Sequence, residues 1–206
     1  MTRLTQAVKQ CTKCSELSST RTQPVLGDGP VPCDIVFLGE SPGFHEDQSG
    51  IPFCGPSGKL LEALARSVGL QRKVDYHILN VLKCRPPNNR DPYPKEVENC
   101  TPYLVQQLRV IQPKVVLALG KYAQAVLLGV PGNAIGVVQN MGHVYRHPDF
   151  YVVLSCHPRF TSSDAEIVRA FKLHIKLAKH IAKRKGEPKC TARNALFHST
   201  TTPTKN

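Results

Sequence analysis

The sequence predicts an α/β fold in which helices wrap a parallel sheet. Short runs of β-branched and aliphatic residues alternate along the chain with segments whose apolar residues recur every three or four positions. Such alternation is typical of strand-helix-strand units. With 206 residues, 41% of them hydrophobic and 20% charged, the chain is long enough for one domain with its own core.

The first half of the chain contains two predicted strands with a helix between them. Residues 34–39 and residues 77–82 are short apolar runs that favour strands. Between them, residues 57–68 have apolar side chains at helical spacing, namely Leu60, Leu61, Leu64 and Val68.

The second half repeats this alternation. Helices are predicted at residues 94–110 and 121–128, and strands at residues 114–119 and 151–155. Residues 142–146 are expected to pair as a short strand with residues 150–154 around the turn at His147-Pro148-Asp149. Because no repeat or linker divides these elements, they predict one doubly wound α/β domain.

A last helix is predicted at residues 163–185, with Ser163 and Glu166 as a capping box. Its buried stripe would comprise Ile167, Phe171, Ile175, Ala178 and Ile181. Residues 187–206 have no periodicity and are expected to be a disordered basic tail, which leaves residues 1–186 as the domain.

Unusual segments follow three of the four predicted parallel strands. These segments are Gly39-Glu40-Ser41-Pro42-Gly43, Lys83-Cys84-Arg85-Pro86-Pro87 and Cys156-His157-Pro158-Arg159. In doubly wound folds the ligand lies beyond the carboxyl ends of the strands. The three segments should therefore converge on one site.

The net charge favours a polyanionic partner. Lys and Arg number 27 against 15 Asp and Glu, a formal charge of +12, and nucleic acid is the leading partner class. Ten Lys and Arg against three Asp and Glu in the last 46 residues account for +7 of it, so a solvated basic helix face is a simpler alternative for that part.

The beginning of the chain lacks an apolar signal core, and the longest apolar run, Val115 to Leu119, is too short to span a bilayer. We expect a soluble cytoplasmic protein without a membrane partner. In that compartment the eight cysteines would be reduced, and would serve as metal ligands or buried side chains.

Four of the cysteines are candidate metal ligands. Cys11 and Cys14 form a C-x-x-C pair in a polar segment, and Cys84 and Cys100 lie sixteen residues apart. Four thiolates could hold zinc or an iron–sulfur cluster, and the spacing favours neither. Cys84 and Cys100 could equally be buried apolar side chains. The other cysteines, which are Cys33, Cys54, Cys156 and Cys190, are expected not to be ligands.

A series of motifs resembles the family-four, iron–sulfur branch of the uracil-DNA glycosylase superfamily from Cys11 to about Lys183. The motifs are Cys11-x-x-Cys14, Gly39-Glu40-Ser41-Pro42-Gly43 with Glu46-Asp47, Gly50-x-Pro52-Phe53-x-Gly55, Asn80-Val81-x-Lys83-Cys84-Arg85-Pro86-Pro87-Asn88-Asn89-Arg90, Cys100 and His157-Pro158. Each motif is weakly diagnostic alone, whereas their order and spacing are specific.

The resemblance implies a three-layer α/β/α sandwich with a central four-stranded parallel sheet. It also implies a 4Fe-4S cluster on Cys11, Cys14, Cys84 and Cys100. The activity it implies is hydrolysis of the deoxyuridine N-glycosidic bond in single- or double-stranded DNA, which releases uracil and leaves an abasic site. We accordingly expect a monomer that binds uracil-containing DNA near the nucleoid of a bacterial or archaeal cell.

The resemblance also assigns catalytic roles. His157 would hydrogen-bond uracil O2 and support the departing anion. Glu40 would either orient the attacking water or stabilise the cationic sugar, and the sequence leaves both roles open.

Further residues would bind the base. Phe53 would stack on the extruded uracil, and Asn80 could satisfy both N3–H and O4 because an amide carries a donor and an acceptor. Glu46 would obstruct the thymine methyl group. Gly39 and Ser41 belong to the same binding loop.

Contacts to the DNA backbone are predicted for the cations Lys83, Arg85, Arg90 and Arg159, and for Ser57 and Ser162. The chain departs from the family at Ser41, where Ala is usual, and at Arg159-Phe160, where relatives have a small residue and a leucine-containing wedge loop. Phe160 could act as the wedge. These departures keep a second hypothesis open, an iron–sulfur DNA-binding protein with weak or altered glycosylase activity.

Overall fold

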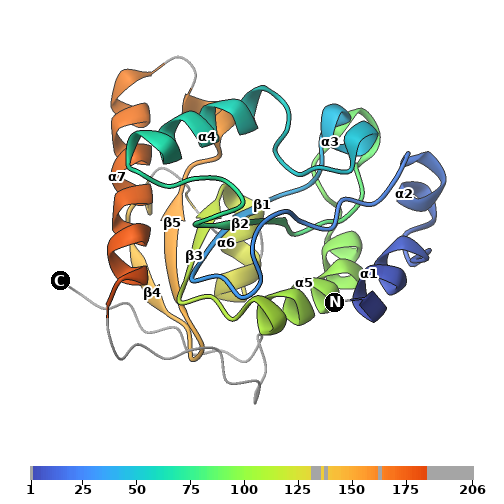
Figure 1. The fold of residues 1–206 in the computed structure, drawn as a ribbon. Coiled ribbons are helices and arrows are strands. Elements are labelled where there is room, and N and C mark those ends of the chain that lie inside the picture. The colour runs from blue at the N-terminus through green and yellow to red at the C-terminus, as the bar shows by residue number, and fades with distance from the viewer. Residues whose placement is uncertain (1, 131–135, 137–138, 162–163, 185–206) are drawn as a thin grey trace.

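The computed structural model describes residues 2–130, 136, 139–161 and 164–184. These residues form a five-stranded sheet with the strand order β2-β1-β3-β5-β4 (Figure 1). Four strands are parallel: β1 (Ile35–Gly39), β2 (His77–Asn80), β3 (Val115–Leu119) and β5 (Tyr151–Ser155). The α/β fold class is confirmed. The predicted count of four strands omits β4 (Val144–Arg146), which pairs antiparallel with β5 as the predicted hairpin.

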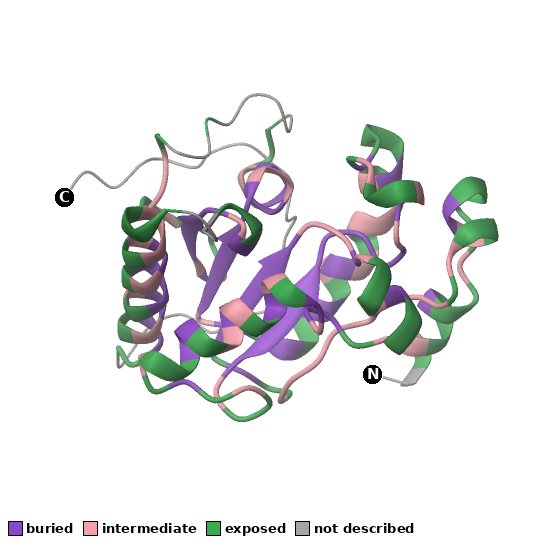
Figure 2. Cartoon of the chain, turned by 90° about the horizontal axis from the view of Figure 1, so that it is seen from above, coloured by how far each residue is buried: buried purple, intermediate pink, exposed green. Residues whose placement is uncertain are grey.

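Helices cover both faces of the sheet, as expected for a three-layer sandwich (Figures 1 and 2). One face packs against α5 (Pro94–Ile111) and α6 (Lys121–Leu128), and the other against α4 (Pro56–Ser67) and α7 (Ala165–Ala182). Because β1 and β3 are buried on both faces, their sequences are continuously apolar rather than alternating.

The N-terminal elements lie beside the sandwich. They are α1 (Thr2–Lys9), α2 (Ser15–Thr20) and α3 (Phe44–Ser49), and α1 contacts α5. Short 3₁₀ turns occur at Pro87–Asn89 and Pro158–Thr161. None of the helices in the described parts of the chain is long and apolar enough to cross a membrane.

The last helix starts later than predicted. Its N-cap is Asp164, whose carboxylate accepts hydrogen bonds from the backbone N–H groups of Glu166 and Ile167 at 2.8 and 3.3 Å. The capping box with Ser163 is therefore wrong, because an Asp one residue later satisfies the same free amides. Ser163 and the predicted tail at residues 187–206 lie outside the described residues.

Candidate active site

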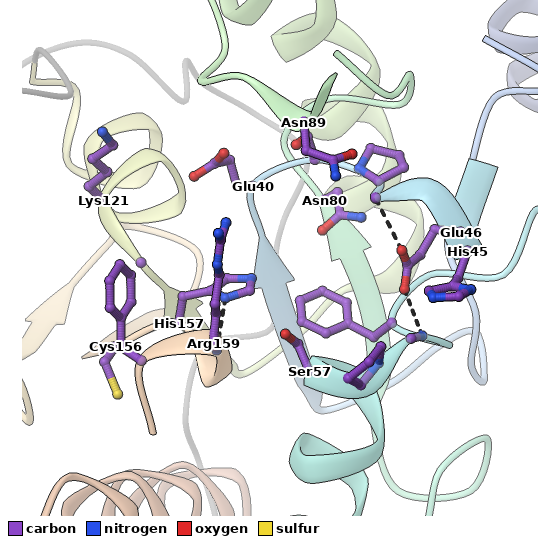
Figure 3. A pocket seen from close by; sticks show the side chains of 18 of the residues that line it. Glu40, His45, Glu46, Ser57, Asn80, Asn89, Lys121, Cys156, His157 and Arg159 are labelled. Atoms are coloured by element: carbon purple, nitrogen blue, oxygen red, sulfur yellow. Dashed lines mark hydrogen bonds between the residues drawn. The ribbon is translucent and has the colours of Figure 1, made fainter. Parts of the chain in front are cut away.

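A cleft of about 660 Å³ lies beyond the carboxyl ends of the parallel strands (Figure 3). Side chains from the loops after β1, β2, β3 and β5 line it, together with the start of α4. The fold brings these predicted site residues together on its wall: Glu40, Ser41, Glu46, Phe53, Ser57, Asn80, His157 and Arg159.

Asn80 and Phe53 pack against the same glycine. A Cβ atom on Gly39 would lie 2.5 Å from both the Asn80 side-chain oxygen and the Phe53 ring. Asn80 is only 3% exposed, and its Oδ1 has no hydrogen-bond partner within the described part of the chain. A buried carbonyl without a donor is costly, so this atom is suited to a ligand that supplies an N–H group.

Phe53 has a strained backbone that several groups hold in place. Its φ of 51° is left-handed, which is uncommon for a residue with a side chain. The Arg72 guanidinium donates to the Phe53 carbonyl at 3.0 Å and also to that of Pro52, and it pairs with Asp28 at 3.1 Å. A Cβ on Gly58 would lie only 1.8 Å from the Phe53 carbonyl oxygen. The motif pattern predicts neither Arg72 nor the contact of Gly58 with Phe53, because it carries no sign of such tertiary contacts.

Glu46 links two segments of the cleft wall through its carboxylate. Its two carboxylate oxygens accept hydrogen bonds from the Gly43 and Gly55 backbone amides, at 3.1 and 2.8 Å (Figure 3). The side chain thereby ties the start of α3 to the segment that carries Phe53.

His157 is a neutral imidazole that can donate a hydrogen bond. Its Nδ1 accepts from the Arg159 backbone N–H at 3.2 Å, so in the neutral ring the proton belongs on Nε2. The ring is partly open to the cleft but closely surrounded by protein atoms, and this burial, with a smaller effect of the Arg159 charge, lowers its pKa to about 4. Its ring centre lies 5.8 Å from that of Phe53.

Glu40 is poised to change protonation near neutral pH. Burial, and to a smaller extent the neighbouring Asp91, raise the pKa of its carboxyl to about 7, against the opposing charges of Lys121 and Arg159. Lys121 and Asp91 form an ion pair at 2.6 Å on the cleft rim. The rule that ligands lie at strand ends could have found Lys121, which lies two residues after the end of β3.

The predicted DNA-contact residues fall in different environments. Lys83 is 1% exposed, its ammonium donates to the Asn80 backbone carbonyl at 2.5 Å, and burial lowers its pKa to about 8. A DNA contact through Lys83 is therefore wrong, because the side chain points into the protein. Arg90 is held by Glu96 and Glu16, at 2.6 and 2.5 Å.

The other predicted DNA contacts remain at the surface or outside the described residues. Arg85 is half-buried and donates to the Asn89 side chain at 2.7 Å. Arg159 is exposed on the cleft rim, and Ser57 lies in the first turn of α4. Ser162 lies outside the described residues.

The four predicted ligand cysteines, Cys11, Cys14, Cys84 and Cys100, line one small second pocket. Three N–H donors point at its sulfur atoms: Arg21 at 2.9 Å from Cys84 Sγ, the Lys83 amide at 3.3 Å from Cys100 Sγ, and Asn99 at 3.5 Å from Cys14 Sγ. Within the described ranges, no three His, Cys, Asp or Glu side chains form a ready-made site for a metal ion. The four thiols and these three N–H donors nevertheless match the ligand set and hydrogen bonding of an iron–sulfur cluster.

The remaining described cysteines lie elsewhere. Cys33 is buried and its thiol donates a hydrogen bond to the Ile35 carbonyl, Cys54 contacts Ser49, and Cys156 lines the cleft. Cys190 is outside the described residues.

Comparison with known proteins yields a consistent group of relatives. A sequence model of the uracil DNA glycosylase superfamily matches residues 26–176. Proteins named type-4 uracil-DNA glycosylase are 51% identical over 120 residues in Archaeoglobus fulgidus and 43% identical over 140 residues in Thermotoga maritima. These matches cover 58% and 68% of this chain, and 59% and 71% of the respective relatives.

Proposed function

Because the chain belongs to the uracil-DNA glycosylase superfamily, we propose that it hydrolyses the N-glycosidic bond of deoxyuridine in DNA. The observation that carries this proposal is the juxtaposition of Asn80, Phe53, His157 and Glu40 around one cleft. The Asn80 carbonyl without a donor matches the N3–H group of uracil, and Phe53 offers a ring for the extruded base. Cytosine has an unprotonated N3 and would leave that carbonyl unpaired.

In the reaction, negative charge develops on the departing uracil and positive charge on the deoxyribose. The cleft carries one residue that can act on each of these two groups. As the bond from C1′ to N1 breaks, its electron pair moves to the uracil, whose O2 accepts a hydrogen bond from the neutral His157. Water then adds to C1′, and Glu40 accepts its proton. The Glu40 pKa of about 7 favours the role of general base over a purely electrostatic role, because a general base works best when its pKa lies near the operating pH.

The four cysteines would hold a 4Fe-4S cluster that joins the N-terminal segment to the rest of the protein. When bound, the cluster would supply a structural cross-link. Arg21 donates both to Cys84 Sγ and to the Cys11 carbonyl, and the next residue, Thr22, donates its amide to both oxygens of the buried Asp47. Since Asp47 lies in α3, the thiol pocket is connected to one wall of the cleft.

Removing a ligand cysteine should loosen this wall. We expect Cys11→Ser to lose iron and to speed hydrogen exchange at residues 21–25 and 44–49, while β1 and β3 stay protected. Cys54→Ser is the matched control for iron content and for exchange at residues 21–25, because Cys54 lies outside the thiol pocket and contacts Ser49 instead. Mass spectrometry with iron analysis measures both effects. A wild-type protein that is colourless and iron-free after anaerobic purification would contradict the cluster assignment.

Gly39→Ala is expected to impair uracil recognition because the added methyl group meets Phe53 and Asn80. Overpacking of this kind costs about 1–3 kcal/mol. Gly129→Ala is the control: its φ of 68° makes Ala cost about 1–2 kcal/mol, yet no atom lies within 4 Å. Urea unfolding should show similar decreases in the free energy of unfolding for both variants. Only Gly39→Ala should slow excision, and an equal slowing in Gly129→Ala would count against the role of Gly39.

The function itself is tested with uracil-containing oligonucleotides, single- and double-stranded, followed by alkali to cleave abasic sites. Iron-loaded protein should produce breaks at uracil and none at thymine or cytosine. Absence of breaks, while a known glycosylase cuts the same substrate, would exclude the proposed activity.

A further inference from the structure

Two exposed phenylalanines lie on the rim of the cleft. Phe44 at the start of α3 is 53% exposed, and Phe160 in the turn after β5 is 66% exposed. Among the Phe and Tyr residues that the structure describes, Tyr93 is the other one that is more than half exposed; the Arg90 guanidinium packs over its ring, and it does not line the cleft. Phe160 occupies the predicted wedge position, whereas the function described above leaves Phe44 unexplained.

Phe44 is held in place although it is exposed. The Arg85 guanidinium lies 5.1 Å from the centre of its ring, and Asn89 fixes that guanidinium at 2.7 Å. The His45 ring meets it edge-on at 5.7 Å. The Glu46 carboxylate anchors the preceding backbone through the Gly43 amide. A rigid aromatic ring loses little conformational entropy when a flat ligand binds to it.

An aromatic ring beside a guanidinium has the chemistry that binds unpaired nucleotides. Bases stack on such rings regardless of sequence, and the cation attracts the phosphate. Phe44 and Phe53 line the same cleft, so a nucleotide next to a uridine bound at Phe53 has access to the Phe44 ring at the rim. We propose that Phe44 and Arg85 form a stacking platform for a base next to the extruded uridine. The inference rests on the proposed function and adds a preference for single-stranded DNA.

The chain contains no tryptophan, so Phe44→Trp introduces a single tryptophan at the platform, whose emission can be excited separately from that of the tyrosines. Its emission should be quenched by a single-stranded oligonucleotide without uracil, and less by the same sequence as a duplex. Leu173→Trp is the control, because Leu173 is 56% exposed on α7 and does not line the cleft. Its emission should not respond.

Affinity provides the second measurement. Loss of one base stack costs about 1–3 kcal/mol, so Phe44→Ala should weaken single-strand binding roughly 5- to 150-fold, and Phe44→Tyr should restore it. Leu173→Ala should bind as wild type does. Melting temperatures confirm that the variants fold. Unchanged affinity in Phe44→Ala, or an unresponsive Phe44→Trp, would overturn the platform.

The use of uracil-free DNA separates the two proposals. If wild type releases uracil but Phe44→Trp is not quenched, the platform fails and the activity stands. If quenching occurs without uracil release by the wild type, the activity fails and the chain binds single strands by this ring.

Discussion

Replacing His157 by alanine should slow uracil release by about 10²- to 10³-fold while DNA binding changes little. Removal of one preorganised donor to a developing anion has an effect of this size. His157 acts as this donor in its neutral form, because burial and the Arg159 charge lower the pKa of its ring to about 4. Single-turnover rates at saturating protein measure the chemical step without product release.

The pH dependence distinguishes this role from that of an imidazolium. A ring with a pKa of about 4 keeps one charge state from pH 5 to 8, so His157 should add no titration to the rate in that range. His157→Gln keeps an N–H donor and should recover part of the loss. A wild-type rate that fell above pH 6.5, with this fall absent in His157→Ala, would show that the protonated ring is the donor.

Glu40→Gln should have two opposite effects, a loss of activity of at least 10²-fold and a gain in stability above pH 7. The gain follows from the raised pKa. Between pH 4.5 and about 7 the folded protein retains a proton that the unfolded chain has lost, so this group lowers the free energy of unfolding as pH rises. Above pH 7 the destabilisation caused by the ionised, buried Glu40 reaches its full size, up to about 3 kcal/mol, and Gln removes it because it carries no charge.

Urea unfolding at pH 8 and pH 4.5 measures the stability effect. The variant should exceed wild type at pH 8 and match it at pH 4.5, where Glu40 is protonated in the folded protein. The wild-type excision rate should rise through pH 7 as Glu40 ionises, and the residual rate of Glu40→Gln should not. An unchanged rate in the variant would remove Glu40 from the mechanism.

Much of the fold follows from local patterns. Apolar runs buried on both faces identified the four parallel strands, because helices on each side leave these strands no solvent-facing positions. The turn at residues 147–149 indicated the hairpin of β4 and β5. The start of α7 was misjudged because Ser163 and Asp164 are comparable caps, and neighbouring caps are hard to tell apart from sequence.

By itself the sequence determined the residue types at the strand ends, their motif order, and hence the family and the cleft where they meet. The tertiary structure alone decided their physical states. Burial by distant segments sets the pKa values of Glu40 and His157, turns Lys83 away from any DNA, and lets Arg72 hold Phe53 from 19 residues away. Desolvation and such contacts depend on atoms that are near in space but far apart in the chain, so no local pattern encodes them.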